Sequence, residues 1–328
     1  MSLPDRGALA LLNLLLCVRH LPQVLRFRRK VGYFPSIAHP RRYHEKMLWR
    51  KLLDHNPVFQ VFCDKLATKD YVRAVCPSLQ VPGTLWVADS VAGCLAHPMP
   101  PGTLLKCSHG WRMNHRVRDG QKDVAHLIAM LSGWMTHAHG RKDHQWGYWA
   151  VPRKLFLEEA VDHDGIDKLL DISIRCVDGN AFLGSVSAMI NTENMRIGYF
   201  DRDGQRMGSG GFAGTGKELP ADFELPQAFF EAVRHAESLS RGVDYARYDF
   251  LYNGETLFAG EITVYPAAGL NRSSDGVLEN MVNDLWDIRR SWFLRAEQRG
   301  WRSWYAQMLQ KALADDASRP SSPQQTAA

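Results

Sequence analysis

The sequence predicts an α+β fold, and three observations lead to that class. Apolar residues recur at helical spacing in 42–54 and 227–240, which predicts amphipathic helices. Residues 169–190 and 245–264 contain β-rich runs around Asp-Gly and Asn-Gly pairs, which are typical of antiparallel hairpins. The composition is 45% hydrophobic and 23% charged, and 328 residues are enough for one large or two moderate globular domains.

Residues 1–60 are predicted to be mostly helical. Their apolar run, 8–18, is too short for a membrane-spanning helix, and no small-residue cleavage site follows it. The basic amphipathic segment 21–30 comes next. Packing of the first helix against the rest of the protein is the simpler interpretation, and peripheral contact with an anionic membrane surface is the alternative.

Three lysines between residues 59 and 107 lie where they could meet an anion. A single helix over 59–75 would carry Lys65 and Lys69 on one face, four residues apart. A buried strand over 102–107 carries Lys106 into a polar loop, where an ammonium and backbone N–H groups can converge on a phosphate. The alternative for each lysine taken alone is a solvated or snorkelling side chain.

Short strands are predicted in the middle of the chain, and a loop follows them. A strand over 154–157 ends in Glu158 and Glu159, and another strand covers 195–200. The segment from 201 to 226 is rich in glycine and charge, which indicates a loop.

That loop contains GFAGTGKE (211–218), which resembles a P-loop. Glu218 stands where Ser or Thr would bind magnesium, and the strand–loop–helix context is missing. We therefore reject it as a phosphate site. The chain ends with one or two long helices over 276–314 and a low-complexity tail over 315–328, which we expect to be disordered.

The register of the hairpin in 245–264 decides whether its acidic residues share a face. With a two-residue Asn-Gly loop, Asp249 and Glu261 fall on opposite faces. With a three-residue loop over 253–255 and its glycine at positive φ, Arg247 pairs with Glu261 and both acids lie on one face. We adopt the three-residue loop.

In that register one face of the hairpin carries four polar side chains: Arg247, Asp249, Glu261 and Thr263. The Cβ atoms of the two acids would lie about 7 Å apart, a span that one or two hard cations can bridge through oxygen ligands. Arg247 beside them would meet an anion. The alternative is a solvated face with a cross-strand Arg–Glu pair.

Charge and cysteine usage narrow the range of partners. The formal charge is +5, and because Lys and Arg are spread along the chain without a basic stripe, we expect no nucleic-acid partner. The six cysteines form no CxxC pair and no zinc-like spacing, which favours a reduced, cytoplasmic compartment. The oligomeric state stays open.

Five segments in series resemble the TupA-like branch of the ATP-grasp superfamily, which is found in bacterial cell-surface polymer biosynthesis. The resemblance covers roughly residues 35–275. The segments that carry it are HEKMLWRKLLDHNPVFQVFCDKLATKDYV (44–72), LLKCSHG (104–110), WAVPRKLFLEEAV (149–161), LLDISIRCVDGN (169–180) and RYDFLYNGETLFAGEITVYPAAG (247–269).

The resemblance implies an ATP-grasp fold, in which two α+β subdomains grip ATP. The core would cover 61–275, between a helical N-terminal segment (1–60) and C-terminal helices (276–314). Lys65 or Lys69 matches one lysine that contacts the phosphates in this family, and Lys106, with the loop residues His109 and Gly110 after it, matches another.

The resemblance also implies roles for later residues. Leu157, Glu158 and Glu159 match the hinge at which backbone groups read adenine and a carboxylate holds the ribose. The acids of the hairpin, Asp249 and Glu261, match the Mg²⁺ ligands, with Thr263 where many relatives have Asn, and Arg247 matches the arginine that steadies the transferred phosphoryl group.

The function implied is an ATP- and Mg²⁺-dependent carboxylate–amine ligase, acting on a small-molecule or glycan-precursor carboxylate through an acyl-phosphate. Two alternatives remain open at this point. The same cleft could phosphorylate an alcohol, as in a kinase, or the protein could be a catalytically silent nucleotide-binding scaffold. The sequence does not name the acid or the amine.

Overall fold

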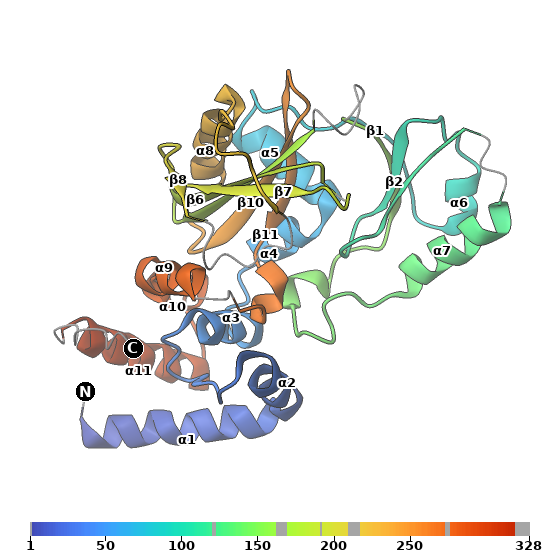
Figure 1. Ribbon diagram of the computed structural model, residues 1–328. Helices are drawn as coiled ribbons and strands as arrows, with labels where there is room; N and C mark the ends of the chain where they lie inside the picture. Colours follow the sequence, from blue (N-terminus) through green and yellow to red (C-terminus); the bar gives the residue numbers. More distant parts are fainter. Residues whose placement is uncertain are drawn as a thin grey trace.

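The computed structural model describes residues 2–119, 123–161, 169–190, 192–208, 217–272 and 276–318. In these residues two β-sheets with their covering helices lie above a layer of helices drawn from both ends of the chain (Figure 1). Their strands pair antiparallel with one exception, between two short strands of the larger sheet. The predicted α+β class is confirmed.

The smaller sheet has four strands, in the order β1 (Thr84–Ala88), β4 (Leu155–Glu159), β2 (Thr103–Cys107) and β3 (Asn114–Arg116). Two helices lie along it in Figure 1, α6 (Val91–Leu95) and α7 (Val124–Thr136). Leu105, Leu131 and Leu157 are fully buried in the core of this unit. β4 is a central strand, since it pairs with both β1 and β2.

In the described residues the larger sheet has seven strands: six follow the order β11-β10-β5-β6-β7-β8, and the seventh, β9, pairs parallel with β7. Their bounds are β5 (Leu170–Val177), β6 (Asn180–Ala188), β7 (Arg196–Phe200), β8 (Arg206–Met207), β9 (Lys217–Glu218), β10 (Ala246–Tyr252) and β11 (Leu257–Thr263). The predicted pairing of the segments around Asp178-Gly179 is confirmed by β5 and β6.

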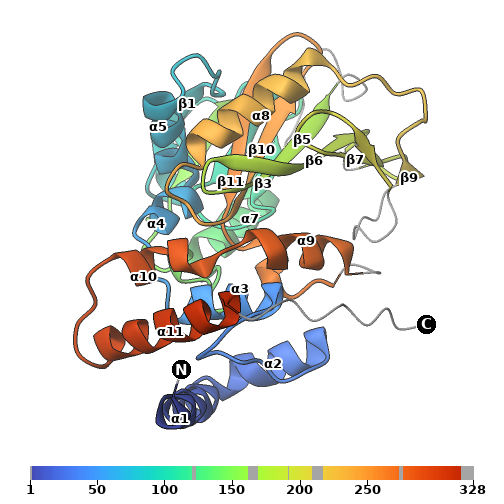
Figure 2. The same ribbon diagram turned by 90° about the vertical axis from the view of Figure 1, so that its left-hand side faces the viewer.

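Helix α8 (Gln227–Leu239) crosses one face of the larger sheet (Figure 2). Its residues Phe229, Ala232 and Ala236 recur at helical spacing and are completely buried between the helix and the sheet. The Phe229 ring fits because residue 184 of β6 is glycine: a Cβ atom there would lie 2.5 Å from the ring. The hydrophobic core of the molecule continues from this face into the helical layer.

The helical layer joins the two ends of the chain. Its members are α1 (Leu3–Arg19), α2 (Leu21–Val31), α3 (Tyr43–Leu52), α9 (Val277–Leu285), α10 (Trp292–Arg295) and α11 (Trp301–Ala317). Lys46 Nζ of α3 donates to the carbonyl groups of Asn283 (2.9 Å) and Trp286 (2.6 Å), and Trp49 Nε1 donates to the Tyr305 hydroxyl at 2.8 Å. The N- and C-terminal helical segments therefore pack together as one layer.

A buried charge pair fixes α3 to the larger sheet. Arg50 is fully buried; its Nη2 donates to Asp244 Oδ1 at 2.7 Å, and its Nη1 donates to the carbonyl groups of Tyr245 (2.8 Å) and Val264 (2.9 Å). Trp286 Nε1 donates to the other oxygen of Asp244, also at 2.7 Å. Both carboxylate oxygens of Asp244 thus have donors inside the protein.

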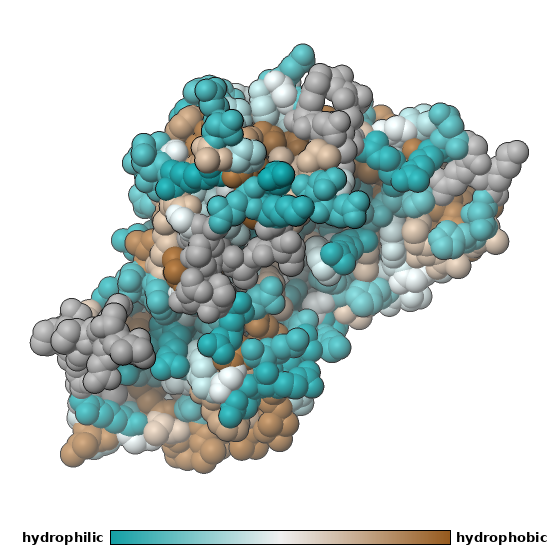
Figure 3. All heavy atoms as spheres, viewed as in Figure 1, coloured by the Kyte–Doolittle hydropathy of each residue, from teal (hydrophilic) through white to brown (hydrophobic). Residues whose placement is uncertain are grey.

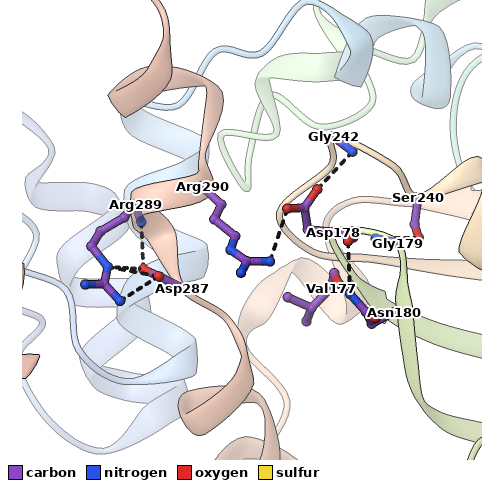
Figure 4. A network of polar contacts seen from close by, with 9 residues as sticks. All are labelled: Val177, Asp178, Gly179, Asn180, Ser240, Gly242, Asp287, Arg289 and Arg290. Carbon is purple, nitrogen blue, oxygen red and sulfur yellow. Dashed lines mark hydrogen bonds and ion pairs between the residues drawn. The ribbon is translucent and has the colours of Figure 1, made fainter.

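A second, more exposed polar network ties the C-terminal segment to the turn between β5 and β6 (Figure 4). One Asp178 oxygen accepts from the backbone N–H of Gly242 at 3.0 Å, and the other lies 3.1 Å from Arg290 Nη1. Asp287 pairs with Arg289 next to it. Because Asp178 has positive φ, 44°, these contacts help to hold a conformation that an Asp adopts at a cost.

The helix predicted over 59–75 is wrong as a single helix, because the chain breaks at Asp64. α4 (Val58–Cys63) ends there and α5 (Lys65–Val75) begins. Asp64 is extended, and its Oδ1 accepts from Leu66 N at 2.9 Å, so it caps the second helix. At the other end, α11 continues to Ala317, beyond the predicted boundary at 314, while 211–216 and 319–328 lie outside the described residues.

Helices α1 and α2 form the outer edge of the layer (Figure 1). Within the described chain, no helix by itself has both the length and the apolar character needed to cross a membrane. These two pass that test only when taken together, and their axes are bent by 95° relative to each other.

Candidate active site

A cleft of about 600 Å³ lies between the two sheets and collects most of the predicted site residues. Residues of β2, β3 and β4 line one side, and residues of β5, β10 and β11 line the other. The predicted residues that line it are Lys65, Lys69, Lys106, Gly110, Glu158, Glu159, Arg247, Asp249 and Glu261.

The hairpin register differs from the prediction. Tyr252 pairs with Leu257, so the loop has four residues, and the predicted three-residue loop is wrong. Asn253 explains the longer loop: its Oδ1 accepts from the backbone N–H groups of Glu255 (3.1 Å) and Thr256 (2.8 Å), which closes an Asx turn. The glycine of the loop has positive φ, 99°, as expected.

A register shift beside Asp249 restores the shared face. Near the loop Phe250 pairs with Ala259, whereas beyond Asp249 the partner of Arg247 is Thr263. The shift requires glycine at 260, since a Cβ atom there would lie 2.7 Å from the Asp249 carbonyl oxygen. The predicted common face of the four polar residues is therefore confirmed, although the pairing that produces it is different.

Asp249 is the centre of the contacts on this face. Its carboxylate accepts two hydrogen bonds from Arg247, from Nε to Oδ1 and from Nη2 to Oδ2, both at 2.7 Å. Ser173 Oγ on β5 also donates to Oδ1 at 2.7 Å. The Thr263 hydroxyl lies 3.1 Å from Glu261 Oε1 and 3.5 Å from Asp249 Oδ2. One hydroxyl thus bridges the two carboxylates, which places them within reach of a single cation.

The donor set suits magnesium better than a metal that needs a full protein cage. In the described part of the chain, no group of three His, Cys, Asp or Glu side chains is arranged to hold a metal. Mg²⁺ is commonly bound by one or two carboxylates together with phosphate oxygens and water. Asp249 and Glu261 could supply those two ligands, and Thr263 orients them.

The sequence prediction missed Asp171 on β5. It lines the cleft, and burial, followed by the nearby Asp249, raises its pKa to about 7. Burial alone would lower the pKa of Arg247, but Asp249 and the other acids around it raise that pKa above its ordinary value. Pairing β5 with β10 would have revealed Asp171, because Ser173 lies opposite Asp249 and alternation puts Asp171 on the same face.

The opposite wall of the cleft is cationic and is organised by Glu158. Lys69 Nζ lies 2.6 Å from Glu158 Oε2, and Lys106 Nζ binds Oε1. Burial alone would raise the pKa of Glu158, but Lys106 and Lys69 together hold it below the ordinary value. Lys69 is fixed further by the Pro82 carbonyl (2.9 Å) and the Thr84 hydroxyl (2.7 Å).

Lys65 reaches the cleft from the first turn of α5. Its ammonium donates to the carbonyl of Gly110, in the loop after β2. Burial lowers the pKa of Lys65, and the negative charge of Glu261 opposes that shift. Lys65 and Lys69 both line the cleft, so the structure brings together both members of the pair that the sequence left as alternatives.

Two predicted residues point elsewhere. Leu157 is fully buried in the core of the small sheet and pairs with Trp86 and Leu105 on either side. His109 is also buried, with Nδ1 3.1 Å from Cys107 Sγ and Nε2 3.0 Å from the His137 carbonyl. Neither lines the cleft, and the hinge contributes Glu158, Glu159 and Val161 instead.

The family comparison bears directly on this arrangement. The family model described as TupA-like ATPgrasp matches residues 45–286. This chain belongs to the TupA-like ATP-grasp family. The match starts in α3 and ends after α9, so it includes both sheets and the whole cleft. The predicted family and the ATP-grasp α+β fold are confirmed.

Several solved structures resemble the TupA-like chain more distantly. They include D-alanine–D-alanine ligase from Helicobacter pylori (13% identity, TM-score 0.40, 69% of this chain and 62% of that one). Another is the ATP-grasp ligase PsnB complexed with a phosphomimetic variant of its minimal precursor, Mg and ADP (12% identity, TM-score 0.35, 64% and 51%). This chain spans about half of PsnB, and likenesses this distant assign no individual residues. A search of curated proteins found no match.

Proposed function

We propose that this TupA-like protein is an ATP- and Mg²⁺-dependent carboxylate–amine ligase in bacterial cell-surface polysaccharide biosynthesis, working on the cytoplasmic side. One observation carries the proposal. Three lysines on one side and an Arg–Asp–Glu constellation on the other line a single cleft in an ATP-grasp chain. Such a cleft has cations for phosphates and oxygen ligands for a hard metal ion.

The lysines and the hinge would bind the nucleotide. The ammonium groups of Lys65, Lys69 and Lys106 line the cleft and can contact phosphate oxygens. Glu159 follows Glu158 on β4, and Glu158 is the carboxylate that pairs with Lys69 and Lys106. Phosphate binding by Lys69 and Lys106 would replace part of their pairing with Glu158. Asp249 and Glu261 would hold Mg²⁺, which supplies positive charge to the phosphate oxygens when bound.

The reaction would then proceed in two transfers. A carboxylate oxygen of the acid attacks the γ-phosphorus of ATP, ADP leaves, and an acyl-phosphate forms. The amine nitrogen attacks the acyl carbon, phosphate leaves with the bonding electron pair, and the nitrogen loses a proton to give the amide. Arg247, which donates two hydrogen bonds to Asp249, would neutralise negative charge on the transferred phosphoryl group.

The first experiment is nucleotide binding, measured by calorimetry with and without MgCl₂. We expect ATP to bind and its affinity to rise with Mg²⁺. No binding under either condition would remove the proposal. Asp249→Asn serves as the matched variant, because it is similar in size and keeps one oxygen acceptor, but loses one negative ligand and one of the two hydrogen bonds from Arg247.

The second experiment separates the ligase from a kinase. ATP is supplied with panels of sugar acids and amino acids, and ADP, free phosphate and product mass are measured. A ligase releases both ADP and phosphate only when acid and amine are present together. Release of ADP alone, with a phosphoryl group retained on the product, would instead identify a kinase, and binding without turnover a silent nucleotide-binding protein.

A further inference from the structure

The outer side of α1 is apolar, and its orientation is fixed by the opposite side. Leu9 and Leu16 are buried against the body of the protein. Asn13 Oδ1 accepts from the backbone N–H groups of Ile37 at 2.6 Å and Ala38 at 3.0 Å. The leucines on the other side therefore cannot turn inward without breaking these contacts.

We call the solvent-facing side of helices α1 and α2 the outer apolar face. On α1, the side chains of Leu11, Leu14, Leu15 and Val18 are 58–65% exposed. Figure 3 shows hydrophobic residues along the lower edge of the molecule, where α1 lies in Figure 1. The face consists of Leu3, Leu11, Leu14, Leu15 and Val18 of α1 and Leu21 and Leu25 of α2.

Positive charge is concentrated beside this face. Residues 1–34 contain six arginines and lysines and one aspartate, so they carry the whole formal excess of +5, and the rest of the chain is formally neutral. Arg28, Arg29 and Lys30 are exposed in the last turn of α2. An apolar face next to a basic cluster is the pattern of a helix that lies in a membrane interface.

We propose that the outer apolar face of α1 and α2 docks on an anionic lipid bilayer, with its leucines among the upper acyl chains and its basic cluster at the lipid phosphates. α1 alone is about 25 Å long, so its axis would lie along the surface. The 95° bend between α1 and α2 fits a pair that rests on the membrane rather than crosses it. This inference is independent of the proposed ligase reaction.

A second copy of the chain is the competing occupant of the face. Pairing two such faces would bring two basic clusters together, each with the three positive charges of Arg28, Arg29 and Lys30, and like charges at an interface oppose association. An anionic surface is complementary to both the apolar and the basic parts of the face. The charge therefore favours lipid over a dimer.

The test is flotation of the full-length protein with vesicles of phosphatidylcholine, alone or with 30% phosphatidylglycerol. We expect the protein to float with the anionic vesicles and at least tenfold less with the neutral ones. High salt should weaken binding because it screens the basic cluster. Leu11→Ser, Leu14→Ser and Leu15→Ser combined should reduce flotation at least tenfold, and so should Arg29→Glu with Lys30→Glu.

Matched controls change the same number of exposed apolar side chains, or remove equal charge, elsewhere on the surface. Leu85→Ser, Val124→Ser and Leu285→Ser change exposed side chains on β1, α7 and α9, and Arg234→Glu with Arg299→Glu changes exposed arginines. Circular dichroism checks that each variant is folded.

Three outcomes would overturn the proposal. One is absence of flotation with anionic vesicles. Another is a loss of flotation in the control variants that equals the loss in the variants of the outer apolar face and of the basic cluster. The third is a dimer in light scattering that the triple serine variant converts to a monomer while vesicle binding is absent.

Discussion

Asp244, just before β10, and Asp249, within it, each pair with an arginine, and the two pairs have different roles. The pair in the core, Arg50 with Asp244, has side chains that are 0% and 1% exposed. The pair in the cleft, Arg247 with Asp249, is 29% and 14% exposed. The Arg–Asp distance is 2.7 Å in both pairs, but Arg247 donates two hydrogen bonds to its carboxylate and Arg50 donates one. Burial and neighbours distinguish them.

Each pair has further acidic residues beside it, and in each place one of them has a raised pKa, but access to cations from solution differs between the two places. In the core, Asp54 lies near Asp244, and burial with that neighbour raises the pKa of Asp54 to about 7. In the cleft, Asp171 and Glu261 lie near Arg247, and burial together with the nearby Asp249 raises the pKa of Asp171 to about 7 as well. A cation from solution could reach the acids of the cleft but not those of the core, because Asp54 and Asp244 are buried and do not line the cleft.

The largest effect should follow from breaking the core pair. Asp244→Ala leaves the buried Arg50 guanidinium without its carboxylate and removes the acceptor of Trp286 Nε1. We expect the free energy of unfolding to fall by about 3–5 kcal/mol. Urea denaturation at constant pH measures the change.

The exposed pair Asp70–Arg73 on α5 is the control for this prediction. Its side chains are 81% and 50% exposed, so Asp70→Ala should cost at most about 0.5 kcal/mol. Equal losses from Asp70→Ala and Asp244→Ala would erase the contrast between a core pair and a surface pair.

Breaking the cleft pair should affect activity far more than folding. Asp249→Asn removes one charge from the proposed metal site, and we expect turnover to drop by about 10²–10³-fold. The amide keeps an oxygen acceptor for Arg247 Nε and Ser173 but loses the bond from Arg247 Nη2, so in this partly exposed pair the unfolding free energy should fall less than in Asp244→Ala. Glu255→Gln at the exposed hairpin tip is the matched acid and should leave turnover unchanged. A destabilised but still active Asp249→Asn protein would assign this pair to structure.

A smaller effect is expected from the hydroxyl that bridges the cleft carboxylates. Thr263→Val removes the donor to Glu261 at 3.1 Å, so the affinity for Mg²⁺ in the presence of ATP should fall about 10–100-fold. Binding of ATP without metal should be unaffected, as should both quantities in the control Thr256→Val. Titration with Mg²⁺ measures them, and an unchanged metal affinity would show that Thr263 does not orient the ligands.

The effect that develops most gradually concerns the pH dependence of the core. The carboxyl of Asp54 has a higher pKa in the folded protein than the ordinary value of about 4, so the folded state holds its proton more tightly. The resulting stabilisation is complete below about pH 4 and is lost as pH rises through about 7.

Asp54→Asn removes this titration but keeps an oxygen acceptor for Phe293 N. Its stability relative to the natural protein should therefore rise between pH 5 and pH 8, by at most about 1.4 kcal/mol per pH unit. Denaturation curves at several pH values give the difference, and a constant difference would show that Asp54 stays ionised.

The sequence was most informative where structure depends on near neighbours. The Asn-Gly pair predicted the hairpin, and the two acids were predicted on one face. The loop length depends on one Asn253 side chain, and the register shift depends on the close approach of Gly260 to the Asp249 backbone, which no local pattern reveals. The helix break at Asp64 had a capping residue as its signal, but the strong apolar periodicity around it concealed the break.

The parts that failed depend on contacts between distant segments. Asp171 joins the site only because β5 pairs with β10, whose Asp249 is hydrogen-bonded to Ser173 across 76 residues of chain. The side chain of Leu157 lies in the core because its strand is central, while the contact of its backbone with adenine stays a prediction. Pairing order among strands is set by the whole fold rather than by either strand.

The clasp that Glu158 forms with Lys69 and Lys106 has a consequence for how fast and how tightly the cleft could take up an anion. Long lysine side chains lose considerable rotamer freedom when a ligand fixes them. Here the Glu158 carboxylate already pairs with both ammonium groups. A phosphate that binds would replace Glu158 as the partner of these ammonium groups. Because both lysine side chains are already ordered, its binding would cost less side-chain entropy.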